Sequence, residues 1–134
     1  MTDFSVALQT VVYDALIADT TLTTKLGGNF IYDFVPEQSS FPYVKIGEET
    51  MVDDGTKTKK GSDFTLVVHT FSRYRGSKET KEIMSLIYDV LHESNLVVAG
   101  ASNNMRFEFS DIIKESDGLT THGVQRFRIF VLTN

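Results

Sequence analysis

The sequence predicts an α+β domain in which two helices pack on one face of a mainly antiparallel sheet. Three observations lead to this prediction: segments with apolar residues every three or four positions, segments in which apolar and polar residues alternate, and turn signals between them. In chain order the segments read α–β–β–β–α–β–β, which is typical of an α+β fold. At 134 residues the chain fits a single domain, which we expect to span residues 1–134.

The two helices are predicted over residues 3–18 and 78–93, with Ser77 as the N-cap of the second. Each helix carries one apolar stripe. A short helical turn, residues 19–28, follows the first helix and ends at Gly27–Gly28, where glycine permits a left-handed C-cap. The stripe of the first helix is Phe4, Leu8, Val11, Val12, Ala15 and Leu16, and that of the second is Thr80, Ile83, Met84, Ile87, Val90 and Leu91.

The strands are separated by polar turns that lack apolar residues. Residues 53–61 read as the tip of a long hairpin, which we expect to be mobile in the free protein, and Asp117–Gly118 reads as the turn of the last hairpin. Apolar residues occupy both faces of the third strand, which indicates a central position in the sheet. The predicted strands are residues 30–35, 43–52, 62–74, 105–116 and 122–133.

Both prolines of the chain lie in the stretch IYDFVPEQSSFPYVKIG, residues 31–47. Proline cannot donate to a strand ladder, so Pro36 is expected to end the first strand and Pro42 to stand at the start of the next. The two prolines therefore predict a strand–loop–strand connection.

The net charge of −5 is unevenly distributed along the chain. From Lys57 to Lys81, seven basic residues oppose only Asp63 and Glu79, which gives +5; the remainder has six basic and 16 acidic residues, which gives −10. One interpretation is a solvated hairpin followed by a solvated helix face. The other is that the asymmetry steers docking to a partner or to further copies of the chain.

Motifs that carry catalysis or bind cofactors are absent from the sequence. It contains no GxSxG, P-loop, GxGxxG or HExxH pattern, so we predict neither an enzyme nor a cofactor. The three histidines fall on separate predicted elements without ligand spacing, so no metal site is expected. With no cysteine, disulfides and thiolate sites are excluded. No apolar run reaches the roughly 18 residues of a membrane span and no leader precedes the first helix, so we expect a soluble protein.

A nucleic-acid-binding module is the alternative that the basic residues suggest. The segment FSRYRGSK, residues 71–78, places aromatic side chains among cations, as nucleic-acid-binding surfaces do. The surplus of acidic residues elsewhere argues against it.

Three pieces of the sequence, taken in order, resemble the tail completion family of long-tailed phages, which includes tail-to-head joining and tail terminator proteins. The most specific elements are Tyr32 with Pro36, the FPY triplet at residues 41–43, Ser72–Arg73 followed by Gly76, and the DG…HG…RFR ending at residues 117–128. Length and ending are most similar to the tail-to-head joining proteins of siphophages that infect Gram-positive hosts. The pieces are IYDFVPEQSSFPYVKIGEE, TLVVHTFSRYRGSKE and RFEFSDIIKESDGLTTHGVQRFRI.

The resemblance implies a structural role at the head–tail interface of the virion, after assembly in the host cytoplasm. It implies a sixfold ring on the head-proximal end of the tail tube, with the tail tube protein, the head completion or connector protein and other copies of the chain as partners. It also implies passing contact with DNA in the lumen of the ring. Heterologous contacts in a ring suit a bipolar subunit, so we hypothesise that the partner interface contains Asp53, Asp54, Lys57, Lys59, Lys60, Arg73 and Arg75.

Overall fold

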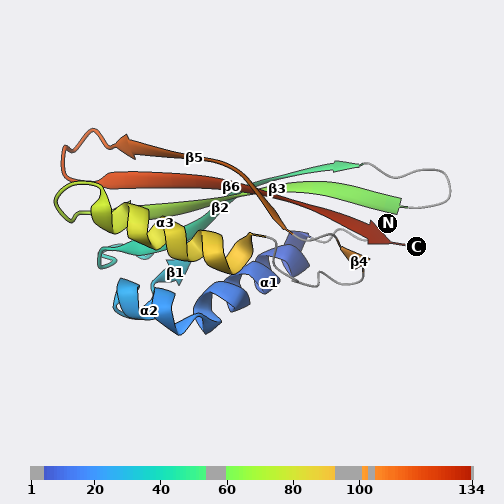
Figure 1. The fold of residues 1–134 in the computed structure, drawn as a ribbon, viewed down its shortest axis with the longest axis horizontal. Coiled ribbons are helices and arrows are strands. Elements are labelled where there is room, and N and C mark those ends of the chain that lie inside the picture. Colours follow the sequence, from blue (N-terminus) through green and yellow to red (C-terminus); the bar gives the residue numbers. More distant parts are fainter. Residues whose placement is uncertain (1–4, 54–59, 93–100, 103–104, 134) are drawn as a thin grey trace.

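The computed structural model describes residues 5–53, 60–92, 101–102 and 105–133. Within that part of the chain, three helices and six strands follow one another (Figure 1), and the predicted α+β class is confirmed. The bounds are α1 Ser5–Ala18, α2 Thr20–Leu26, β1 Ile31–Tyr32, β2 Tyr43–Asp53, β3 Lys60–Ser72, α3 Lys78–Leu91, β4 Ala101–Ser102, β5 Arg106–Lys114 and β6 Thr121–Thr133.

One six-stranded sheet forms the upper layer of Figure 1, and the helices cover one of its faces. The strand order is β1-β2-β3-β6-β4, and β5 also pairs with β6. Every pairing is antiparallel except that of β1 with β2, which is parallel. The long partners β3 and β6 run beside each other from the Lys60–Thr133 pair to the Ser72–Thr121 pair. The predicted central position of the third strand is therefore confirmed.

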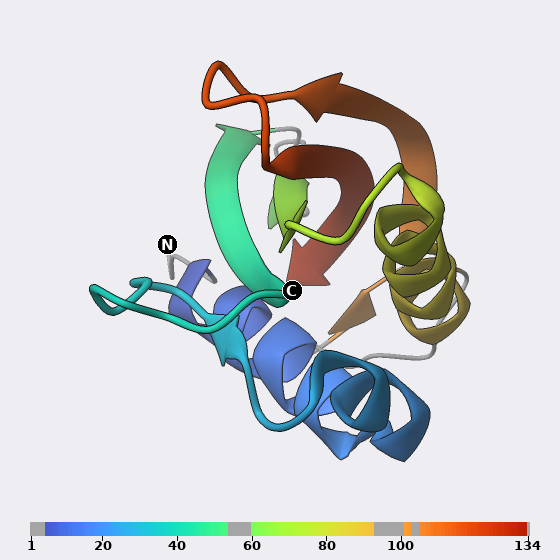
Figure 2. The same ribbon diagram turned by 90° about the vertical axis from the view of Figure 1, so that its left-hand side faces the viewer.

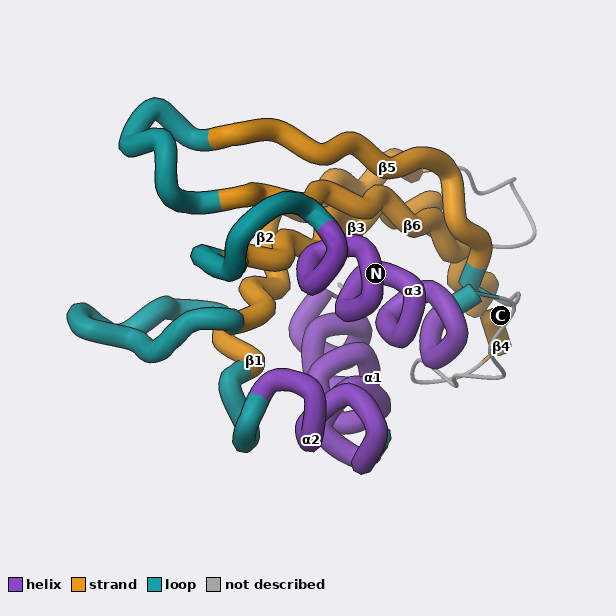
Figure 3. The backbone as a smooth tube through the Cα atoms, turned by 60° about the vertical axis from the view of Figure 1, so that its left-hand side comes forward, coloured by secondary structure: helices purple, strands orange, loops and turns teal. Residues whose placement is uncertain are grey.

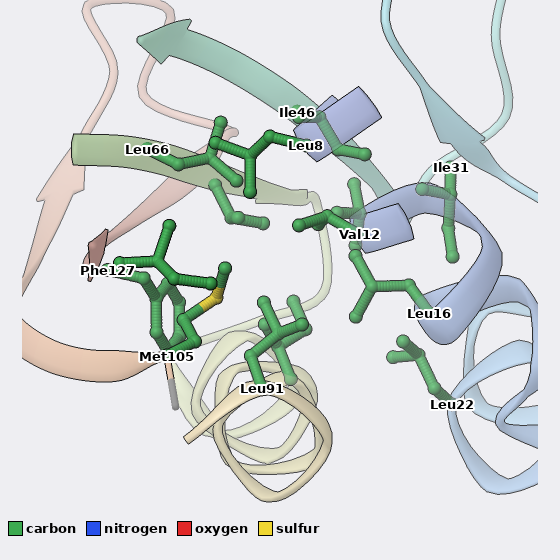
Figure 4. Packing of buried hydrophobic residues seen from close by; sticks show 14 of the residues in the cluster. Leu8, Val12, Leu16, Leu22, Ile31, Ile46, Leu66, Leu91, Met105 and Phe127 are labelled. Atoms are coloured by element: carbon green, nitrogen blue, oxygen red, sulfur yellow. The ribbon is translucent and has the colours of Figure 1, made fainter. Parts of the chain in front are cut away.

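The core lies between the helices and the sheet, as the apolar stripes predict. Figure 4 shows side chains of α1 and α3 meeting those of β2, β3 and β6. Along β3, Phe64, Leu66 and Val68 face the helices and are buried, whereas Val67 and Phe71 on the other face are only partly covered. This alternation follows from the two-residue period of a strand. The helix residues in the core are Leu8, Val12, Leu16, Leu22, Leu26, Ile83, Ile87 and Leu91.

The predicted turn after α1 is the short helix α2, and both of its ends are capped. The Asp19 carboxylate accepts a hydrogen bond from the Leu22 backbone N–H at 2.9 Å. Gly27 has a φ of 87°, and the N–H groups of Gly27 and Gly28 both reach the Thr23 carbonyl. The predicted glycine C-cap is confirmed.

The start of α3 differs in part from the prediction. Ser77 occupies the N-cap position, but its side chain makes no capping hydrogen bond. Its backbone carbonyl accepts from the Lys81 N–H at 2.9 Å. The turn is fastened instead by Ser72, whose hydroxyl donates to the Glu79 carboxylate at 2.6 Å, and by Gly76, which has a φ of 79°.

The predicted strand over residues 30–35 is reduced to the two residues of β1. Pro36 therefore does not end a strand; it lies in a turn where its carbonyl accepts from the Ser39 N–H at 3.2 Å. Pro42 does stand immediately before β2, after a cis peptide bond to Phe41. Because β1 and β2 are parallel, the ten residues between them return the chain to the end from which β1 started, without a crossover helix.

Two further differences concern the ends and spacing of strands, and one prediction is not tested. The pairing of β2 with β3 has an irregularity between Ile46 and Glu49, so the alternation predicted for residues 43–52 shifts there. The short strand β4 was not predicted. The hairpin tip expected to be mobile lies mostly outside the described residues, since 54–59 are not among them.

Candidate assembly interface

The residues predicted to contact partners are divided between the two ends of the sheet. Asp53 is the last residue of β2 and Lys60 the first of β3, so both lie at what we call the hairpin end. Arg73 and Arg75 follow β3 at its other end. Thirteen residues of β3 at about 3.3 Å each separate these ends by about 40 Å. Asp54, Lys57 and Lys59 lie outside the described residues.

Three loops converge at the end opposite the hairpin, and we call this the three-loop end. They connect β1 to β2, β3 to α3 and β5 to β6, and Figure 3 shows them side by side. Each loop exposes one large apolar side chain, namely Phe34 at 86%, Tyr74 at 64% and Leu119 at 61%. Gathering of exposed apolar groups at one end of a molecule is typical of protein–protein contact sites.

Arg73 holds the three loops together. Its guanidinium lies 4.3 Å from the centre of the Phe41 ring, a cation–π contact, and its Nε donates to the Thr120 hydroxyl at 3.2 Å. It also forms an ion pair with Asp117 at 3.6 Å. Arg73 is thus engaged within the chain although half of its side chain is exposed, and Arg75 is exposed as well.

The turn of the last hairpin is closed by Asp117. Its carboxylate accepts hydrogen bonds from the Thr120 and Leu119 backbone N–H groups at 2.9 and 2.8 Å. These bonds, first that of Thr120, lower the pKa of Asp117 to about 2. Gly118 supplies the positive φ of 72°. The predicted turn at Asp117–Gly118 is confirmed.

Behind the three-loop end, four side chains form a hydrogen-bonded row across the sheet face that is free of helices. His69 on β3 and His122 on β6 are 2.7 Å apart, Nδ1 to Nε2. The other nitrogen of His69 lies 2.6 Å from the Glu48 carboxylate, and that of His122 lies 2.7 Å from the Glu115 carboxylate. Phe71 stacks on His122 with ring centres 4.3 Å apart.

The protonation of the two imidazoles decides which of these hydrogen bonds can form. The hydrogen bond between the rings needs a proton on only one of the two inner nitrogens. Burial, and then the charge of His69, lower the pKa of His122. The hydrogen bond from His69 lowers the pKa of Glu48. Protons on both inner nitrogens would break the contact between the rings, which agrees with the lowered pKa of His122.

This row was not predicted from the sequence. The histidines do lie on separate elements, as expected, but the closeness of His69 and His122 could not be seen because they are 53 residues apart. Two features could have indicated the contact. His69 lies on the outward face of its strand, and antiparallel pairing places the beginning of β6 beside the end of β3. Within the described ranges, no three His, Asp or Glu residues are arranged to hold a metal ion.

His92 lies at the C-terminal end of α3. It follows α3 as the C-cap residue, but its Nδ1 accepts a hydrogen bond from the Phe107 backbone N–H at 3.1 Å. Its role is to join the end of α3 to β5.

Residues 10–132 of the chain match the family described as tail completion protein gp17. The chain belongs to this family. Over 95 residues it is 25% identical to the tail completion protein gp17 of Bacillus phage SPP1, a match that covers 70% of each chain. Its fold is similar, with a TM-score of 0.90, to a chain from the virion of the native gene transfer agent (GTA) particle. That chain is 26% identical, and the similarity covers 99% of this chain and 100% of the other.

These comparisons confirm the predicted family. The chain is a structural phage tail protein and a component of the virion. No helix in the described part of the chain is long and apolar enough to span a membrane.

Proposed function

We propose that this protein caps the head-proximal end of a phage tail tube and joins the finished tail to the connector of the DNA-filled head. In this proposal residues 1–134 act as a single, non-catalytic assembly domain. The observation that carries the proposal is the family match over residues 10–132, together with the fold similarity to a virion chain over nearly the whole length. The partners are the tail tube protein, the head completion or connector protein and further copies of the chain.

The shape of the molecule supports a joining role. Its long sheet presents two ends about 40 Å apart that differ in chemistry. At the hairpin end β2 finishes at Asp53 and β3 begins at Lys60, and the sequence between them adds Asp54, Lys57 and Lys59, so acidic residues are followed by basic ones. The three-loop end carries exposed apolar side chains beside Arg75. A subunit in a ring between tube and connector needs two such different ends, one for each partner.

The nucleic-acid alternative receives less support from the geometry. Of the basic segment 57–81, Lys60 and Arg73 lie at opposite ends of β3 rather than on one stripe. The two acidic residues of that segment are also engaged, Asp63 with Arg128 and Glu79 with Ser72. The passing contact with DNA inside a ring requires no such stripe.

The test uses tails that lack this protein, to which purified protein and filled heads are added. Replacing Lys57, Lys59 and Lys60 by alanine should leave the fold intact and reduce tail–head joining at least about tenfold, because interface charges guide docking. The matched control removes the same charge at Lys25, Lys45 and Arg106. Equal joining by both triple variants would remove the hairpin end from the interface, and salt-sensitive binding of free DNA would favour the alternative.

A further inference from the structure

The loop between β1 and β2, residues 33–42, projects from one side of the molecule. Figure 2 shows it on the left, beyond α1 and β2. It is held in shape by the Ser39 N–H, which donates to the Pro36 carbonyl at 3.2 Å, and by the Ser39 hydroxyl, 3.4 Å from the Tyr32 hydroxyl. Phe34 is the most exposed large apolar side chain in the described part of the chain, at 86%. The loop is thus an ordered projection with an aromatic group on its surface.

A groove between α3 and β5 lies on the opposite side of the molecule, at the right in Figure 2. It encloses about 360 Å³. The core-facing side of α3 is the stripe Ile83, Ile87 and Leu91. The neighbouring stripe, formed by the residues that follow these along the helix surface, makes one wall of the groove. The apolar lining consists of Met84, Tyr88, Phe107 and Ile112.

A buried amide forms part of the lining of this groove. Gln125 is 2% exposed, and its Nε2 donates to the Met84 carbonyl at 2.9 Å. Its Oε1 is buried and accepts no hydrogen bond from any residue that the structure describes. A buried acceptor without a donor is unfavourable, so an occupant that brings an amide N–H gains a hydrogen bond as well as apolar contact.

The charges around the projection and the groove are opposite. Asp33 and Glu37 flank Phe34 in the loop DFVPE, and both are exposed. Lys81 lines the groove, and exposed Lys78 lies one turn earlier on the same side of α3. The loop also carries backbone N–H groups for the Gln125 acceptor. A second copy of this chain therefore offers an occupant that matches the groove in apolarity, charge and hydrogen bonding.

We propose that the β1–β2 loop of one copy inserts Phe34 into the α3–β5 groove of the next copy. The contact joins two different surfaces on opposite sides of the subunit, and a contact of this heterologous kind repeats around a ring. It leaves the hairpin end free for one of the tail tube and the connector, and the β3–α3 and β5–β6 loops of the three-loop end free for the other. This inference rests on the ring assembly in the proposed function and identifies the residues by which neighbours meet.

An aromatic anchor in a desolvated pocket contributes much of the affinity of such a contact. The Phe34→Ser variant should therefore associate with its neighbour at least about 30-fold more weakly. Leu119→Ser is the matched control, because Leu119 is an exposed apolar residue at the same end of the sheet but on another loop. Both variants should fold as the wild type does, since both side chains are exposed.

The direct test uses the absence of cysteine from the chain. The double variant V35C/S85C keeps Phe34 and places one thiol beside it on the loop and one in the groove wall, and L119C/S85C is the control. Each variant is added to tails that lack the protein, treated with a short bismaleimide cross-linker and separated by denaturing electrophoresis. We expect a ladder of covalent oligomers for V35C/S85C and mainly monomer for the control.

The outcomes distinguish the contact from the function. Capped tubes without a ladder, together with normal capping by F34S, would overturn the contact and leave the joining role intact. A ladder of the same strength from both cysteine pairs would also overturn it, because the contact would not be specific. Bare tube ends with the wild-type protein would overturn the contact and the proposed function together.

Discussion

Gly123 on β6 lies against Thr80 and Met84 of α3, and its replacement by alanine provides a quantitative test of this packing. A Cβ atom at this position would overlap the Met84 Sδ and lie 2.9 Å from the Thr80 Cγ2. The φ of Gly123 is not in the left-handed region, so the expected cost is steric and not conformational. Met84 can rotate only in part because it is 6% exposed. Overpacking of this kind costs about 1–3 kcal/mol in the free energy of unfolding.

The expected shift in the unfolding temperature follows from the length of the chain. With about 2.1 cal/mol/K of unfolding entropy per residue, 134 residues correspond to a shift of about 4 °C per kcal/mol. Gly123→Ala should therefore lower Tm by about 4–11 °C in thermal unfolding followed by circular dichroism.

Truncation of the clashing side chain provides the control. Met84→Ala alone should destabilise by about 2–5 kcal/mol because it leaves a cavity. Combined with Gly123→Ala, it should cost at least about 1 kcal/mol less than the sum of the two, since the added methyl group fills part of that cavity. An unchanged Tm for Gly123→Ala, or strictly additive effects in the double variant, would refute the close packing of β6 against α3.

Three further predictions concern single residues. Gly76→Ala should cost about 1 kcal/mol in urea unfolding through backbone strain alone, because its φ is 79° and no atom lies within 4 Å of the new methyl group; no loss would contradict that φ. The pKa of Asp117 is lowered to about 2, so its contribution to stability is present above about pH 4 and is lost as the pH falls toward 2. Asp117→Ala should make the free energy of unfolding depend less on pH between about pH 4 and 2. An unchanged pH dependence would exclude the Asp117 hydrogen bonds as its cause. The pKa of His122 is also lowered, so its neutral form stabilises the fold above pH 6.5 and this contribution declines below it. His122→Phe keeps a ring against Phe71 and should remove the decline; a wild-type pH profile would contradict the assignment.

The parts of the fold that depend on local periodicity could be predicted from the sequence. The stripe of α3, the two faces of β3 and the turn at Asp117–Gly118 were correct because each depends on spacing within one segment. The parallel pairing of β1 with β2 was not predicted. A strand of two residues has almost no periodic signal, and pairing direction depends on the path of the loop.

The candidate site shows the same division. The sequence indicates which residues face outward, but not which outward residues of different strands lie side by side. The contact of His69 with His122 depends on the register of β3 against β6. That register cannot be predicted from the sequence because a helix, not a short turn, connects the two strands. The groove at Gln125 likewise forms only when β5 and α3 lie beside each other in space.

If this protein caps tails and joins them to heads, electron microscopy can show both steps. Purified protein is mixed with cognate tails that lack it, and negatively stained tube ends are examined before and after the addition of filled heads. The account predicts a new cap on one end of each tube and restored attachment of heads. Tube ends that stay bare at saturating protein would contradict it.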